Sequence, residues 1–159
     1  MSNMQVASFA AGCFWGVESR FRKLDGVLDA EVGYMGGTSP NPSYQEVCTG
    51  QTGHAETVRL EFDPEVISYG ALLDAFFEMH NPTTLNRQGP DRGTQYRSAV
   101  FYYDEPQRKA ALKKIDELGR AGKWREPIVT QVEQAGEFWR AEEYHQRYLE
   151  KNQGAHCSV

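Results

Sequence analysis

The chain has 159 residues, of which 40% are hydrophobic and 25% charged, a length and composition typical of one globular domain. Its 17 Lys and Arg against 22 Asp and Glu give a net charge of −5 without a basic cluster, which argues against nucleic acid and anionic membranes as partners. No stretch reaches the ~20 apolar residues of a membrane span, and the N-terminus lacks the pattern of a signal peptide. Three cysteines without CxxC spacing favour reactive thiols in a reducing cytoplasm over a disulfide framework.

Hydrophobic spacing and turn residues predict the secondary structure in chain order. The first half is predicted as a strand over residues 5–10, a helix over 14–24, a strand over 27–34, a loop over 35–43 with a capping box at 43–46, and a strand over 54–62. The second half is predicted as a helix from 68 to 81, a polar loop over 82–94, a strand over 96–103, a helix from 104 to between 119 and 122, a strand over 128–133 and a helix over 141–151.

The first six predicted elements follow the order β-α-β-β-α-β, and α-β-α comes after them. This order matches the split-βαβ, ferredoxin-like arrangement, an α+β two-layer sandwich with helices on one face of a mostly antiparallel sheet. No repeat or linker divides the chain. We therefore expect a single domain over residues 1–151, which would hold any catalytic site, and a flexible C-terminal tail over residues 152–159.

Cys13 lies where the first predicted strand meets the first predicted helix, within Gly12-Cys13-Phe14-Trp15-Gly16. Backbone N–H groups at a helix start have no partner inside the helix, and with the helix dipole they stabilise a thiolate, the nucleophilic form of cysteine. The flanking glycines let another molecule approach the sulfur closely. A small buried core residue is the alternative interpretation, and the position alone does not decide between them.

Residues 11–18, Ala-Gly-Cys-Phe-Trp-Gly-Val-Glu, resemble the signature of the type A peptide methionine sulfoxide reductases. Segments similar to that family continue in the same order through nearly the whole chain, at residues 33–34, 36–37, 41–44, 47–50, 53–56, 91, 93–98, 138–139 and 141–146. The resemblance implies an α/β roll with a two-layer core. It also implies an enzyme in which Cys13 attacks the sulfur of methionine S-sulfoxide, free or in proteins, and so reduces it to methionine.

Glu56 is the candidate general acid. Strand alternation places its carboxyl on the face that carries Val58, Leu60 and Phe62, where loss of hydration raises a carboxyl pKa as acid catalysis near neutral pH requires. The alternative is that the strand starts one residue later and Glu56 is an exposed loop carboxylate. The resemblance favours the first interpretation, because Glu56 matches the family's acid in Gly-His-Ala-Glu.

The resemblance also implies roles for other residues. Tyr44 and Tyr96 resemble the phenols that hydrogen-bond the sulfoxide oxygen, and Asp91 resembles a further polar group of the site. Phe14 and Trp15 resemble the walls of the pocket that holds the substrate methyl group. Without the resemblance, such tyrosines would be interpreted as half-buried structural residues.

A second thiol is needed to resolve the sulfenic acid that oxygen transfer leaves on Cys13. Cys157 is predicted to be this recycling cysteine, since a flexible tail could bring it within the Cα–Cα distance of about 7 Å that a disulfide requires. Cys48 is the other candidate, although a small buried residue is the favoured interpretation for it. The resemblance implies that thioredoxin or a dithiol then reduces the disulfide, so we expect an external reductant, no bound cofactor, no metal, and a monomer. The family's tails are glycine-rich, whereas this tail has only Gly154.

Two other functions fit parts of the pattern. A cysteine hydrolase would use Cys13 with a distant histidine. A zinc-binding module would use the cysteines and histidines, but closely paired ligands are absent from the sequence. His54 and His145 could each act as a base, but such residues are more often packed or surface imidazoles, and we assign neither a catalytic role.

Overall fold

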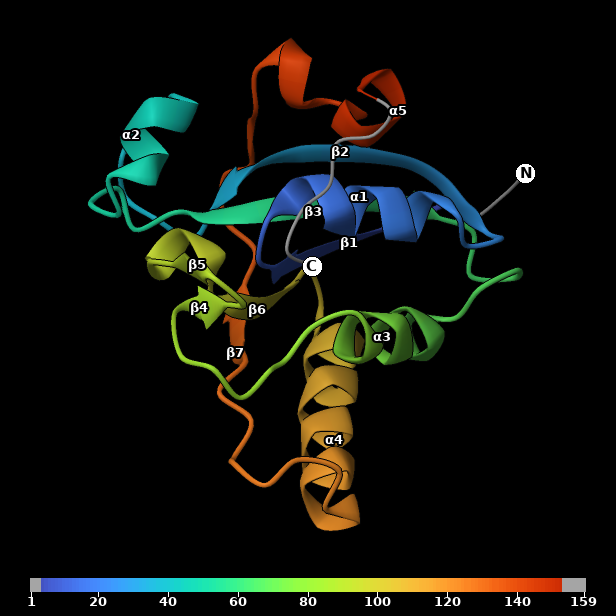
Figure 1. Cartoon of the computed structure of the whole chain (residues 1–159). Coiled ribbons are helices and arrows are strands. Elements are labelled where there is room, and N and C mark those ends of the chain that lie inside the picture. Colours follow the sequence, from blue (N-terminus) through green and yellow to red (C-terminus); the bar gives the residue numbers. More distant parts are fainter. Residues whose placement is uncertain (1–3, 153–159) are drawn as a thin grey trace.

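One six-stranded sheet forms the centre of the fold. A computed structural model describes residues 4–152, and its six-stranded sheet contains β1 Gln5–Ala11, β2 Val27–Met35, β3 Ala55–Phe62, β6 Ser98–Tyr102, β7 Gln131–Gln134 and β8 Trp139–Arg140 (Figure 1). The strand order is β7-β6-β1-β3-β2-β8, and every neighbouring pair is antiparallel except the parallel pair β6 and β7. The four central strands have the order of the split-βαβ arrangement, so the predicted fold class is confirmed.

The main helices begin at the capping residues that the sequence predicted. Ser68 accepts a hydrogen bond from the Ala71 N–H ahead of α3, and Asp104 accepts one from the Gln107 N–H ahead of α4. Ser43 and Glu46 form the predicted capping box of a five-residue helix. The helices are α1 Phe14–Arg22, α2 Tyr44–Cys48, α3 Tyr69–Glu78, α4 Glu105–Ala121 and α5 Tyr148–Lys151, with 3-10 turns η1 Thr94–Tyr96 and η2 Glu143–His145. None of the helices within residues 4–152 is long and apolar enough to cross a membrane.

The main core lies between the sheet and the helices α1 and α3. Phe9 of β1 stacks on Phe21 of α1 at 5.3 Å and on Phe76 of α3 at 5.2 Å, so both helices cover the same face of β1. Each of these rings is fully buried, which stabilises the fold by about 1.5–3 kcal/mol a side chain. The opposite face carries a smaller cluster that includes Met35 and Phe101. The sheet therefore presents its larger apolar face to the helix layer, as the alternation predicted.

The predicted boundaries are wrong in the second half of the chain. Tyr96 belongs to the 3-10 turn η1 rather than to a strand, because Gly93 at φ 136° turns the chain before β6. The predicted polar loop contains a small hairpin, β4 Arg87–Gln88 and β5 Asp91–Arg92. The strand predicted over 128–133 begins only at Gln131, and the short strand β8 was not predicted.

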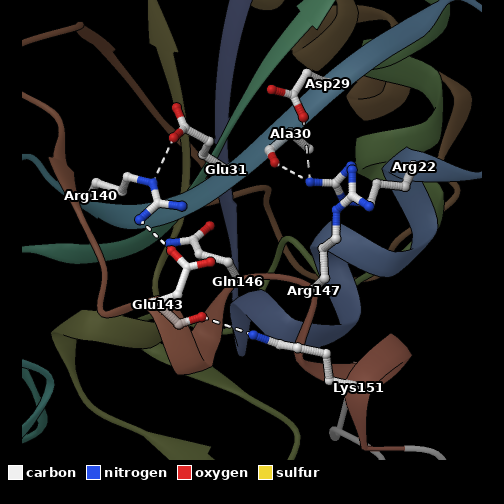
Figure 2. A pocket seen from close by; sticks show the side chains of 9 residues that line it. All are labelled: Arg22, Asp29, Ala30, Glu31, Arg140, Glu143, Gln146, Arg147 and Lys151. Atoms are coloured by element: carbon white, nitrogen blue, oxygen red, sulfur yellow. Dashed lines mark hydrogen bonds and ion pairs between the residues drawn. The ribbon is translucent and has the colours of Figure 1, made fainter.

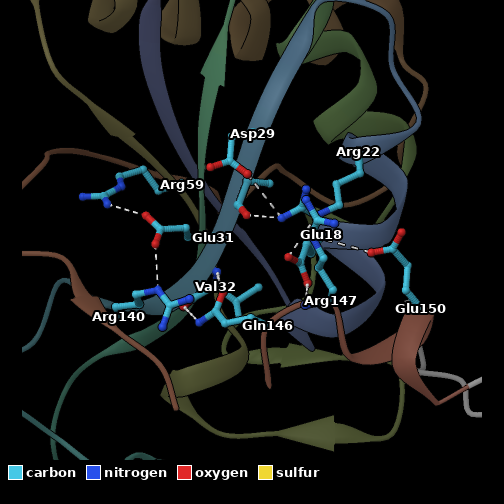
Figure 3. Close-up of polar contacts among 11 residues, drawn as sticks. Glu18, Arg22, Asp29, Glu31, Val32, Arg59, Arg140, Gln146, Arg147 and Glu150 are labelled. Atoms are coloured by element: carbon cyan, nitrogen blue, oxygen red, sulfur yellow. Dashed lines mark hydrogen bonds and ion pairs between the residues drawn. The ribbon is translucent and has the colours of Figure 1, made fainter. Parts of the chain in front are cut away.

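The predicted helix over residues 141–151 is also wrong, since this segment forms only η2 and α5. Its polar groups form hydrogen bonds with β2 and α1 instead of the backbone hydrogen bonds of a continuous helix. The Gln146 side chain accepts from the Val32 N–H and donates to the Val32 carbonyl, both at 2.9 Å (Figure 3). The Arg147 N–H donates to the buried carboxylate of Glu18, and Arg147 itself adopts a left-handed backbone at φ 53°. These long-range bonds hold the segment along the edge of β2 beside α1.

Candidate active site

Cys13 occupies the junction of β1 and α1, as predicted. It is half-buried and immediately precedes Phe14, the first residue of α1. Gly12 adopts φ 98°, a left-handed backbone that favours glycine and that turns the chain from the strand into the helix. The N–H groups of the first helical turn consequently lie next to Cys13, in the arrangement that stabilises a negatively charged sulfur.

Glu56 reaches this same helix start from β3. Its side chain is 2% exposed, so the alternative of an exposed loop carboxylate is wrong. Its Oε1 accepts a hydrogen bond of 3.1 Å from the Phe14 N–H, the amide that follows Cys13. Burial raises the pKa of Glu56 to about 8, with a further rise from the charge of Asp91 and a partial reduction from the Phe14 N–H. The carboxyl is therefore mostly protonated at neutral pH and can donate a proton beside Cys13.

The two predicted phenols lie within electrostatic reach of Glu56. Tyr44 is the first residue of α2 and Tyr96 the last of η1, and both are half-buried. Burial raises the pKa of each phenol well above its ordinary value, and the charge of Glu56 raises it further. Asp91, in β5, interacts electrostatically with Glu56 and Tyr96. The fold thus brings together Tyr44, Tyr96, Glu56 and Asp91 from four separate elements, with both hydroxyls protonated and able to donate.

Phe14 and Trp15, whose rings form the aromatic wall, lie at the helix start that the Glu56 carboxyl contacts. Phe14 is buried and packs against Tyr44, with ring centroids 6.5 Å apart. Trp15 stacks on Tyr148 of α5 at 3.7 Å with an interplanar angle of 9°. The Trp15 indole Nε1–H donates to Nδ1 of His145 at 2.9 Å. The two rings that were predicted to hold a methyl group are therefore fixed by contacts with α2 and with residues 141–151, the C-terminal segment.

The sequence did not identify the supporting role of residues 142–148. His145 is fully buried, and its burial lowers its pKa, so the neutral imidazole accepts from Trp15. Glu142 accepts from the hydroxyl of Tyr34 and from the N–H of Tyr44, both at 2.9 Å. The only signal for these residues was the family resemblance over 141–146, a polar run that lacks the apolar stripe of a packed helix.

The remaining candidates have different outcomes. Both ring nitrogens of His54 bond to the loop after β2, one accepting from the Gly37 N–H at 3.0 Å and the other contacting the Ser39 carbonyl at 2.7 Å. Cys48 is exposed at the end of α2, so its interpretation as a buried residue is wrong, and its thiol interacts with the Tyr44 hydroxyl. Cys157 lies outside the described residues. Within residues 4–152, no group of three or more His, Cys, Asp or Glu side chains is arranged to hold a metal ion.

A separate cavity of about 220 Å³ lies between β2, α1 and the C-terminal segment (Figure 2). It is lined by Arg22, Asp29, Ala30, Glu31, Arg140, Glu143, Gln146, Arg147 and Lys151, none of which is a predicted site residue. Arg140 bonds to Glu31 at 2.7 Å and to Glu143 at 2.9 Å, and Arg22 lies 3.5 Å from Asp29. These arginines already have carboxylate partners. We therefore interpret the residues around the cavity as an ion-pair network that attaches residues 140–151 to the sheet.

Comparisons with known proteins show which family this chain is similar to. The sequence model of the family described as peptide methionine sulfoxide reductase matches residues 5–159. A peptide methionine sulfoxide reductase MsrA of Methanothermobacter thermautotrophicus is 57% identical over 157 residues, which cover 99% of this chain and 93% of that protein. Mxr1 of Saccharomyces cerevisiae in reduced form is similar with a TM-score of 0.91 and 41% identity, over 98% of this chain and 89% of that one. Mxr1 in complex with Trx2 is similar with a TM-score of 0.65 and 30% identity, over 91% and 84%.

Proposed function

The chain belongs to the peptide methionine sulfoxide reductase family, which makes it a thiol-dependent oxidoreductase, and we propose that Cys13 is its nucleophile and Glu56 its general acid. The observation that carries this proposal is the hydrogen bond from the Phe14 N–H to the buried Glu56 carboxyl. It sets a proton donor next to the residue that would attack the sulfoxide. The raised pKa of Glu56 keeps that proton available at neutral pH.

The proposed step balances as a two-electron exchange between two sulfur atoms. The Cys13 thiolate attacks the sulfoxide sulfur while Glu56 protonates the oxygen. The S–O bond of the substrate breaks and a new S–O bond forms on Cys13. The products are methionine, reduced by two electrons, and a Cys13 sulfenic acid, oxidised by two. Glu56 is left as a carboxylate that regains its proton from solvent.

Substrate recognition is proposed to divide between a polar and an apolar side. The protonated hydroxyls of Tyr44 and Tyr96 suit hydrogen bonds to the sulfoxide oxygen, and Asp91 adds a polar group beside them. Phe14 and Trp15 suit the methyl group. An oxygen site and a separate methyl site would together select one arrangement of substituents around the substrate sulfur. We assign this arrangement to the S epimer, free or in proteins, from the family membership.

Recycling is proposed to use a second thiol and an external reductant. Cys157 would condense with the Cys13 sulfenic acid, releasing water and forming a disulfide, which thioredoxin would then reduce by thiol–disulfide exchange. The yeast relative solved in complex with Trx2 supports a protein reductant of this kind. We propose residues 1–151 as the catalytic domain and 152–159 as a tail that carries Cys157. The odd cysteine count supports a reducing cytoplasmic location; the monomeric state stays a prediction.

The test is methionine formation from each sulfoxide epimer without any reductant. We expect the reduced protein to form about one methionine a chain from the S epimer and none from the R epimer, because each oxygen transfer consumes the Cys13 thiolate and forms a sulfenic acid that nothing reduces back to the thiol without a reductant. Cys13→Ser should form none, since a serine hydroxyl is a far poorer nucleophile toward sulfur. Cys48→Ser is the matched control and should behave as the parent. A folded Cys13→Ser protein that forms methionine would contradict the proposal, and hydrolysis of simple esters by the parent alone would favour a cysteine hydrolase.

A further inference from the structure

Glu142 bridges two residues that come from different parts of the fold. One carboxylate oxygen accepts from the Tyr34 hydroxyl of β2 at 2.9 Å, and the other accepts from the backbone N–H of Tyr44 at 2.9 Å. Tyr34 is fully buried, and its burial raises its pKa, so its hydroxyl is a donor in this contact. The two bonds join the first residue of α2 to a rigid strand of the sheet.

The position of Glu142 is itself fixed by contacts that its neighbours make with β2. The Ala141 N–H donates to the Val32 carbonyl at 2.9 Å, and the Gln146 side chain binds both backbone groups of Val32 (Figure 3). These contacts anchor the residues on both sides of Glu142 to β2, two residues from Tyr34. Glu142 therefore has the sheet as its support, and its reach toward Tyr44 is set by β2.

Tyr44 depends on this support because α2 is short. The helix has five residues, and Val47 is its only buried one. An isolated helix of this length is unstable, so its position has to come from contacts outside it. Its Ser43 cap accepts from the Glu46 N–H, while the Tyr44 N–H, which has no partner inside the helix, is taken by Glu142. Removal of Glu142 would leave the start of α2 without its bond to the sheet.

We propose that Glu142 is a positioning residue for oxygen transfer, which ties the Tyr44 backbone to Tyr34 and so holds the Tyr44 phenol beside Glu56. The inference rests on the proposed function, in which Tyr44 binds the sulfoxide oxygen. We assign Glu142 no contact with the substrate or with the reacting sulfur. Its effect passes through Tyr44, so it should disappear once the Tyr44 hydroxyl is gone.

The length of the side chain at position 142, rather than its charge, should determine the rate of oxygen transfer. In Glu142→Gln the amide oxygen can accept from the Tyr44 N–H while the amide NH₂ donates to the Tyr34 hydroxyl oxygen. Glu142→Asp keeps the charge but is one methylene shorter and cannot span both partners. Glu143→Ala is the matched control, since the neighbouring Glu143 is exposed and its carboxylate pairs only with Arg140 among the described residues.

The experiment measures the first-order rate of methionine formation in a single turnover at saturating methionine sulfoxide. Glu142→Asp and Glu142→Ala should each slow it about 10–100-fold, the effect of losing a hydrogen bond to a charged group. Glu142→Gln should stay within about threefold of the parent, and Glu143→Ala should equal it. Glu142→Ala combined with Tyr44→Phe should be no slower than the slower single variant, because both remove one function.

The contrary results are distinct. A multiplicative double variant would show that Glu142 does not act through Tyr44. A fast Glu142→Asp with a slow Glu142→Gln would show that the charge acts instead of the span, and an unchanged Glu142→Ala would remove the role altogether. If Glu142→Ala does not fold, the single-turnover rates of Glu142→Gln and Glu142→Asp still test the inference. A parent that forms no methionine would overturn the proposed function, whereas an active parent with unaffected variants would overturn only this inference.

Discussion

Replacing Glu56 by glutamine removes one titrating proton from the start of α1 while preserving the size of the side chain. The amide oxygen can still accept the Phe14 N–H, so we expect the fold and much of the substrate binding to be retained. What the variant lacks is an acidic proton. Glu61→Gln is the matched control, because Glu61 lies on the same strand but is exposed.

The magnitude follows from the raised pKa. Moving the carboxyl pKa from its ordinary 4.5 to about 8 corresponds to about 5 kcal/mol of cost for ionising the folded protein. Between these pH values the folded state holds a proton that the unfolded chain has released, so the free energy of unfolding decreases as the pH rises. Relative to Glu56→Gln, the parent should therefore lose up to about 5 kcal/mol of stability between pH 4.5 and pH 8.5.

Two assays test this reasoning. Urea unfolding of parent and variant from pH 4.5 to pH 8.5 gives the difference in stability at each pH. The single-turnover rate of methionine formation gives the chemistry: Glu56→Gln should be slower by about 10²–10⁴-fold, the range for general acid catalysis. The parent rate should decline above a pH of about 8, as Glu56 loses its proton, and the variant should lack that decline. The Glu61→Gln control should match the parent in both assays.

Two outcomes would refute the reasoning separately. A Glu56→Gln protein with the parent's rate and pH profile would exclude the carboxyl as the acid. A stability difference that stays constant with pH would mean that Glu56 is not protonated in the folded protein, whatever its role in the chemistry.

Two further predictions concern recycling and the aromatic wall. Cys157→Ser should keep single-turnover oxygen transfer but lose thioredoxin-linked turnover, measured by coupled NADPH oxidation, because thioredoxin attacks a disulfide that cannot form. Cys48→Ser should retain that turnover, and the reverse pattern would assign recycling to Cys48. His145→Leu should raise KM for methionine sulfoxide about 10–100-fold, since the Trp15 Nε1–H loses its buried acceptor. His145→Asn places its amide oxygen near the position of Nδ1 and should keep a KM close to the parent's, so equal losses in both variants would count against this role.

The sequence by itself determined the parts of the site that depend on local periodicity. Cys13 follows a strand and precedes an amphipathic helix, so its position at a helix start could be predicted from the spacing of apolar residues. Glu56 alternates with Val58 and Leu60, which favoured a buried carboxyl on β3, and the family resemblance favoured this position over an exposed loop. Such signals are readable because neighbours in a helix or strand are fixed by one backbone geometry. The roles of the phenols came only from the family resemblance.

Tertiary structure decided which distant residues support those parts. Trp15 bonds to His145 across 130 positions of sequence, and the Glu142 carboxylate reaches Tyr44 across 98. The helix predicted over residues 141–151 is interrupted because Gln146 gives its side-chain bonds to the backbone of β2, 114 positions away. Contacts of this kind leave no periodic trace, since each partner's local sequence is compatible with many environments. They form only when the sheet order sets β2 beside the C-terminal segment, which the pattern of either segment alone does not specify.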